Sequence, residues 1–146
     1  MNEKILIEGP VSIGIISSYT DYQADNRDQG AYSVFLGRVR ADVKGTRKVK
    51  AIEYSAYEGM TKRVVTEIRN TILSKHSDVG KVVIVHSTGI VEAGGISLFV
   101  LVSAVHRRQA MDACSETVEL IKEKLPIWKK EIFEDNTHEW VDNRLA

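Results

Sequence analysis

An almost uninterrupted apolar run, ISLFVLVSAV at 96–105, is the feature that most limits how this 146-residue chain can fold. The run is too short to cross a membrane and too apolar for a strand with one face in water, so it predicts a central β-strand covered on both faces. His106, Arg107 and Arg108 follow the run directly, and apolar residues then recur at helical spacing as far as Leu125. A buried strand that leads into an amphipathic helix predicts an α/β fold. Charged groups at the carboxyl end of such a strand are well placed to bind a ligand.

The rest of the chain supplies further strands and two more helices. Met60, Val64, Ile68 and Ile72 recur every four residues, which predicts a helix over 58–77. Ser12 caps a short predicted helix that ends near residue 19. Alternating or β-branched segments predict strands at 4–8, 31–40, 51–57 and 81–86, with 51–57 antiparallel to 31–40, and a terminal hairpin that joins 130–134 to 139–141.

Two connections remain between these elements. The basic segment between residues 38 and 50 contains Gly45-Thr46, which favours a mobile loop. This segment is either a solvated hairpin loop or a lip that attracts anions over a site. Residues 91–95 are expected to form a turn, because Gly94-Gly95 suits positive φ.

Length and composition limit the possible classes of protein. The length of the chain, 146 residues, predicts one domain over residues 1–146. Twenty basic residues balance twenty acidic ones, and this balance argues against a nucleic-acid partner. We expect no membrane span and a cytoplasmic location, because no apolar run is long enough to cross a bilayer and the single cysteine fits a reducing compartment. Cys114 falls on the apolar face of the helix after residue 106, so it is expected to be a buried packing residue.

The stretch LIKEKLPIWKKE at 120–131 places one lysine on each side of a helix break. Pro126 ends the helix near Leu125, which leaves Lys122 on the last turn and Lys129 beyond the break. If the chain folds back, the two amines converge, and their repulsion lowers the pKa of one of them. Such a lysine is a candidate acid, base or nucleophile. The alternative is that both are solvated lysines at a helix C-terminus.

The remaining candidate groups are cationic. The four histidines lack metal-ligand spacing, and the sequence has neither a GxGxxG motif nor a GxxxxGK phosphate loop, so no metal or cofactor is expected. A cationic set predicts an anionic substrate, most simply a phosphate, with the chemistry left to lysine. The set consists of Arg40, His106, Arg107, Lys122 and Lys129, with Lys130 beside them.

Four separated blocks resemble one known family. They are FLGRVR at 35–40, EYSAYEGM at 53–60, SAVHR at 103–107 and KEKLPIWKKE at 122–131. In this order and spacing they resemble the large, catalytic subunit of molybdopterin synthase, over nearly the whole chain.

The resemblance implies an αβ hammerhead core with a smaller antiparallel β subdomain, and a central homodimer within a heterotetramer. It also implies a small ubiquitin-like partner whose Gly-Gly tail, as a thiocarboxylate, gives sulfur to cyclic pyranopterin monophosphate. Two such transfers make molybdopterin. The protein is therefore expected to be a sulfurtransferase of molybdenum cofactor biosynthesis.

The resemblance also assigns residues to roles. The essential lysines of the family fall on Lys122 and Lys129. The substrate-binding positions of the family fall on Phe35, Arg40, His106, Arg107 and Arg144. Of these, Arg144 is the C-terminal arginine that reaches into the site of the neighbouring protomer.

This sequence departs from the family pattern at several loop positions. Ala41-Asp42 follows the first motif, Ala93-Gly94-Gly95 replaces a Pro-Gly-acid turn, Ser87 replaces an arginine, and Ile127 replaces an aromatic residue. None of these changes removes a member of the cationic set.

Two other functions fit part of the pattern. One is a non-catalytic α/β module that binds a phosphorylated metabolite, which explains the arginines and the histidine but not two lysines around Pro126. The other is a small RNA-binding domain, which the zero net charge disfavours.

Overall fold

The apolar run forms β6 (Ile96–Ala104), which lies between β2 (Ala31–Arg38) and β5 (Val79–Glu92) in one sheet. From Ser97 onward β6 is buried along its whole length. The expected central strand covered on both faces is therefore confirmed. The structure is a computed structural model in which residues 4–141 are described.

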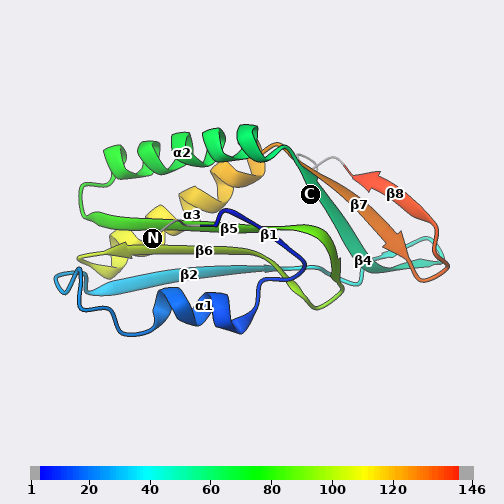
Figure 1. Cartoon of the computed structure of the whole chain (residues 1–146), viewed down its shortest axis with the longest axis horizontal. Coiled ribbons are helices and arrows are strands. Elements are labelled where there is room, and N and C mark those ends of the chain that lie inside the picture. Colours follow the sequence, from blue (N-terminus) through cyan, green and yellow to red (C-terminus); the bar gives the residue numbers. More distant parts are fainter. Residues whose placement is uncertain (1–3, 142–146) are drawn as a thin grey trace.

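Eight strands and three helices make up the described part of the chain (Figure 1). The sheet order is β2-β6-β5-β4-β7-β8, with β1 added beside β5 and β3 beside β4. The pairing of β1 with β5 is parallel, and the other described pairings are antiparallel. The remaining elements are β1 (Leu6–Glu8), α1 (Ile13–Thr20), β3 (Val43–Lys44), β4 (Arg47–Ala56), α2 (Glu58–Lys75), α3 (Arg107–Lys124), β7 (Ile127–Phe133) and β8 (His138–Val141).

Helices cover the two faces of the main sheet. Figure 1 shows α2 and α3 on one side and α1 on the other. Ile68 and Ile72 of α2, which are almost completely buried, pack in the same core as Val100 of β6. Each side chain of this size contributes about 1.5–3 kcal/mol when fully buried. On the opposite face Tyr19 of α1 lies against Phe99, with ring centroids 5.9 Å apart.

The long strand β5 carries the chain from the main sheet to a second group of strands. Its first half pairs with β6, Ser87 and Thr88 pair with β1, and Gly89 to Glu92 pair with β4. The prediction that this strand ends at His86 is wrong. Gly89, at φ +73°, changes the direction of the strand without ending it. The strand continues because β1 and then β4 provide new hydrogen-bonding partners.

The hairpin that was one alternative for the basic segment is present: β3 and β4 pair antiparallel around Gly45, which has φ +65°. The expected pairing of the strand at 51–57 with 31–40 is wrong. The strand predicted at 51–57 belongs to β4, which pairs with β5 and β7 and not with β2. The terminal hairpin is confirmed, although its first strand begins at Ile127 rather than Lys130.

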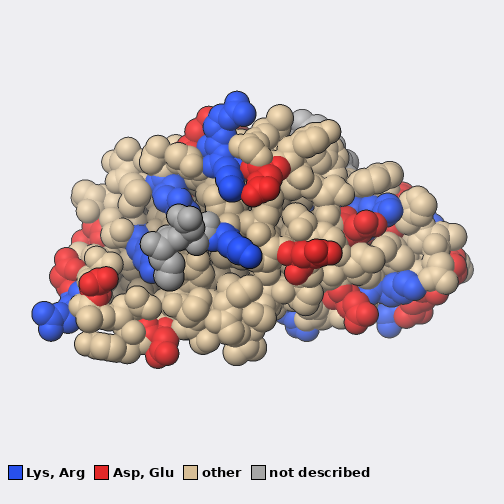
Figure 2. Space-filling view, viewed as in Figure 1, with Lys and Arg blue, Asp and Glu red and all other residues tan. Residues whose placement is uncertain are grey.

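Charge is spread over the surface. On the face shown in Figure 2, acidic and basic side chains of the described residues are interspersed, as expected for a chain with net charge +0. Nothing on this face resembles the continuous basic stripe that an RNA-binding surface needs.

Candidate functional site

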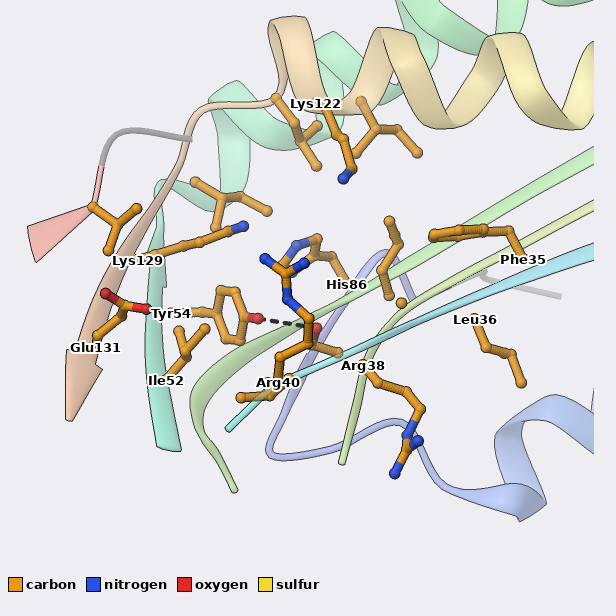
Figure 3. A pocket seen from close by; sticks show the side chains of 18 of the residues that line it. Phe35, Leu36, Arg38, Arg40, Ile52, Tyr54, His86, Lys122, Lys129 and Glu131 are labelled. Carbon is orange, nitrogen blue, oxygen red and sulfur yellow. Dashed lines mark hydrogen bonds between the residues drawn. The ribbon is translucent and has the colours of Figure 1, made fainter. Parts of the chain in front are cut away.

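A cavity of about 470 Å³ lies where the end of β2, the C-terminal end of α3 and strands β4 to β7 come together (Figure 3). Its walls contain aliphatic side chains, including Leu98, Ile121 and Leu125. Its polar lining includes Lys122, Lys129 and Arg40. An apolar cavity with a few converging polar groups is the usual form of a small-molecule site.

The break at Pro126 places both lysines in this cavity. α3 ends at Lys124, the Leu125 N–H donates to the carbonyl of Ile121, and β7 begins at Ile127. Lys129 and Glu131 are two residues apart in β7 and therefore share its pocket face. Figure 3 shows the amines of Lys122 and Lys129 directed into the same space from α3 and β7. The predicted convergence of the two lysines is confirmed.

Electrostatics make the two lysines unequal. The pKa of Lys129 lies below its ordinary value of 10.5, first because of burial, and then because of the charges of Lys122 and Arg40. Glu131 opposes this shift. The expected repulsion between the lysines is therefore present, but burial is the larger cause. A lowered pKa leaves more of the Lys129 amine in the neutral form, which is the form that acts as a base or nucleophile.

Phe35 and Arg40, the two substrate-binding residues expected from the block FLGRVR at 35–40, also line the cavity. The Arg40 guanidinium is largely exposed, lies 3.4 Å from Asp42, and points toward the two lysines in Figure 3. Arg38 does not share its direction. The strand pairing shifts register after Gly37, and Arg38 Nε donates to the carbonyl of Gly94 at 3.0 Å.

Sequence reasoning missed a buried carboxylate in the cavity. Glu131 is 6% exposed and forms an ion pair with Lys44 of the β3–β4 hairpin. The pair fastens the basic hairpin to the cavity wall. The period of two in β7 could have identified Glu131 as a neighbour of Lys129 on the same face.

Two neutral aromatic groups were also missed. Tyr54 of β4 and His86 of β5 are buried, line the cavity and meet edge to face, with ring centroids 5.1 Å apart. The Tyr54 hydroxyl donates to Ser97 Oγ at 3.0 Å, and burial raises the Tyr54 pKa. Tyr54 lies within the block at 53–60 but was not singled out as a site residue. His86 could not be placed from the sequence, because only the bend of β5 brings it to the cavity.

His106 and Arg107 lie elsewhere, at the N-terminal end of α3. They line a second cavity of about 520 Å³ together with Gly30, Val105 and Arg108. Arg107 and Lys122 are separated along α3 by about 22 Å. The cationic set is divided between two cavities and does not gather in one cleft, because α3 holds Arg107 at one end and Lys122 at the other. Arg144 lies outside the described residues.

Asp78 fixes the position of His106. The backbone N–H of His106 donates to Asp78 Oδ2 at 2.9 Å, and His106 Nδ1 lies 3.2 Å from the same oxygen. The side chain of His106 is 74% exposed. His106 and Arg107 therefore lie at the surface beside the N-terminus of α3, where an anion can bind.

Lys130 does not belong to the cavity. Its ammonium lies 3.0 Å from Glu53 and 5.6 Å from the centre of the Trp140 ring. The alternation of β7 turns it to the face opposite Lys129.

Two further searches cover residues 4–141. None of the described helices is long and apolar enough to cross a membrane. Across the same residues, no three His, Cys, Asp or Glu side chains are grouped so that they could hold a metal ion.

The family model described as "MoaE protein" matches residues 11–124. The chain belongs to the MoaE family.

Curated relatives of this MoaE-family chain are named molybdopterin synthase catalytic subunits. The relative from Oryza sativa subsp. indica is 37% identical over 141 residues, covering 97% of this chain and 70% of that protein. The relative from Nostoc is 39% identical over 118 residues, covering 81% of this chain and 71% of that protein. The relative from Dictyostelium discoideum is 36% identical over 143 residues, covering 96% of this chain and 89% of that protein.

Solved structures have the same fold. Molybdopterin synthase from Staphylococcus aureus matches with a TM-score of 0.83 and 33% identity, over 97% of this MoaE-family chain and 98% of that chain. A complex of subunits 1 and 2 of the molybdopterin-converting factor from Helicobacter pylori matches with a TM-score of 0.78, over 95% and 90%. At 22% identity this second match shows the fold alone. The expected mixed α/β class is confirmed.

Proposed function

We propose that this protein is the catalytic subunit of molybdopterin synthase and converts cyclic pyranopterin monophosphate to molybdopterin. The sulfur comes from the thiocarboxylated Gly-Gly tail of a small ubiquitin-like subunit, in two transfers. The observation that carries the proposal is the cavity in which Lys129, with its lowered pKa, faces Lys122. The family membership and the names of the relatives support the same activity.

The two lysines carry the chemistry in this proposal. Lys122, on the last turn of α3, sits beside the reacting carbon and the thiocarboxylate, where it forms a covalent adduct or transfers protons. Lys129 is the second acid–base or positioning group. Its lowered pKa leaves a larger neutral fraction at working pH than an exposed lysine has. Arg40 attracts the substrate phosphate or the anionic tail.

The small subunit approaches through the open side of the cavity in this proposal. An extended Gly-Gly tail can enter a narrow channel that larger side chains would block. Its terminal thiocarboxylate is an anion, so the positive charges of Lys122, Lys129 and Arg40 steer it inward.

A second copy of the chain completes the site in this proposal. His106 and Arg107 lie too far along α3 to reach a ligand bound at Lys122 of their own chain. They and Arg144 therefore hold the substrate phosphate in the site of the neighbouring protomer, within a central homodimer flanked by two small subunits. The exposure of His106 and its fixed position on Asp78 support this role. We place the protein in the cytoplasm, where its single, buried Cys114 stays reduced.

A lysine substitution tests the activity. The Lys122→Ala protein is mixed with thiocarboxylated small subunit and substrate, and molybdopterin formation is followed. We expect turnover to fall at least about a hundredfold while small-subunit binding is kept. Lys124→Ala is the matched control, because Lys124 lies on the same helical turn but does not line the cavity. Undiminished turnover of Lys122→Ala would remove Lys122 from the mechanism. Wild-type protein that binds the phosphorylated substrate without converting it would instead favour a non-catalytic binding module.

A further inference from the structure

The wall of the cavity formed by β5 contains a histidine to which the proposed reaction assigns no role. His86 is 7% exposed, and it lines the same cavity as Lys122 and Lys129. In Figure 3 its imidazole lies within the cavity, near Arg40 and Tyr54. The ring is held on one side by its edge-to-face contact with Tyr54.

The hydrogen bonds of His86 fix which nitrogen carries the proton. Nδ1 lies 2.8 Å from the carbonyl oxygen of Ser87. A carbonyl oxygen can only accept, so Nδ1 must be the protonated nitrogen. In the neutral ring Nε2 then carries a lone pair and can only accept. Among the described residues, none forms a hydrogen bond with Nε2.

The surroundings keep the imidazole neutral. Burial lowers the pKa of His86 to about 4, the Ser87 carbonyl opposes this shift, and the charge of Lys129 adds to it. Protonation would place another positive charge beside Lys122, Lys129 and Arg40. The buried carboxylate nearby, Glu131, already pairs with Lys44. At neutral pH the cavity therefore presents a fixed hydrogen-bond acceptor next to three cations.

We propose that His86 is a substrate-binding residue whose Nε2 accepts a hydrogen bond from an N–H group of the pterin ring. This inference rests on the proposed function and adds a contact for the uncharged part of the substrate. The cations attract the phosphate and the thiocarboxylate, whereas a neutral heterocycle needs apolar walls and oriented donors or acceptors. Phe35, Leu98 and Ile121 supply the apolar walls, and His86 supplies the acceptor. A ligand without an N–H group would leave this acceptor unpaired and would therefore bind more weakly.

The binding experiment uses the complex with an unmodified small-subunit tail, so that substrate binds without turnover. The dissociation constant of cyclic pyranopterin monophosphate is measured by calorimetry for wild type, His86→Phe and His86→Gln. Phe keeps an aromatic ring against Tyr54 but has no acceptor, and Gln keeps an acceptor. We expect His86→Phe to weaken binding roughly fivefold to tenfold, the value of one neutral hydrogen bond, and His86→Gln to restore it to within about twofold.

Two additional measurements separate the contact from a structural role. With thiocarboxylated small subunit, His86→Phe should raise KM by the same factor and leave kcat near the wild-type value. Small-subunit affinity should not change, which distinguishes a pterin N–H from a backbone N–H of the tail. If His86→Phe does not fold, the same comparison is made between His86→Met and His86→Gln, which are similar in size.

The outcomes separate the two proposals. The role of His86 is overturned if His86→Phe binds the substrate as tightly as wild type does, or if it loses affinity only for the small subunit. In either case the proposed function stands as long as the wild-type complex forms molybdopterin. A loss of kcat without a loss of substrate affinity also overturns the role of His86. Wild-type complex that forms no molybdopterin overturns the proposed function, and the assignment of His86 falls with it.

Discussion

Lys122 at the end of α3 and Lys129 in β7 face one cavity because Leu125 and Pro126 turn the chain between them. An unbroken helix would have separated the two side chains by about 10 Å along its axis. The turn instead brings a second positive charge close to a half-buried amine, and this arrangement lowers the pKa of Lys129.

The first prediction concerns this electrostatic coupling. Replacing Lys122 by Gln removes one of the charges that lower the Lys129 pKa, so the pKa should rise toward 10.5. It should not reach 10.5, because burial and Arg40 remain. The change is measured by NMR titration of the Lys129 side chain, with Lys124→Gln as the control. An unchanged Lys129 pKa in Lys122→Gln would show that the two amines do not interact.

The second prediction is that Lys129 lowers the stability of the fold. A lysine whose folded-state pKa is depressed binds fewer protons in the native state than in the unfolded state, so the native state gains stability only as pH rises toward 10.5. Lys129→Met removes this cost and should raise Tm at neutral pH by roughly 2–4 °C while abolishing activity. The gain should shrink as pH approaches 10.5. A Tm below that of wild type at neutral pH would contradict this explanation.

The third prediction concerns acid pH. His86 has a folded-state pKa of about 4 against an ordinary value of 6.5, so the unfolded state binds more protons between these values. The stability it contributes is fully present above pH 6.5 and is lost as pH falls toward 4, a total of about 3 kcal/mol. Urea unfolding of wild type and His86→Gln across this range measures the difference. The Gln variant should show a shallower loss, because glutamine does not titrate, whereas the pKa of Glu116, which hydrogen bonds from His76 and Lys75 hold below its ordinary value, affects stability equally in both proteins. Parallel pH profiles would show that His86 is not held neutral by the fold.

The sequence was sufficient to predict the elements that have strong local signals. The apolar run of β6 and the four-residue spacing of Ile68 and Ile72 in α2 reflect burial that recurs along one element. Pro126 marks a helix end by covalent geometry, and that made the position of Lys122 and Lys129 predictable.

The residues that sequence reasoning placed wrongly depend on long-range pairing. β5 continues past His86 because β1 and β4 offer new ladder partners, and no local pattern records those partners. His86, Tyr54 and Glu131 reach the cavity through this bend and through the pairing of β4 with β7. His106 and Arg107 were grouped with the lysines by charge alone, although the helix predicted between residue 108 and Leu125 already separates these groups along its axis.

The fourth prediction follows from that separation along α3. If Arg107 serves the site of a neighbouring protomer, Arg107→Ala and Lys122→Ala proteins are each inactive but complement one another. In a mixed dimer one site carries both substitutions, and the other has an intact Lys122 and an intact Arg107. Random mixing gives mixed dimers in about half of the population, so activity should recover to about a quarter of wild type.

The two proteins are unfolded and refolded together, and molybdopterin formation is measured with thiocarboxylated small subunit. Arg108→Ala alone is the control for the local loss of charge and should keep its activity. Activity that stays at the level of the separate variants would show that Arg107 does not act across a dimer.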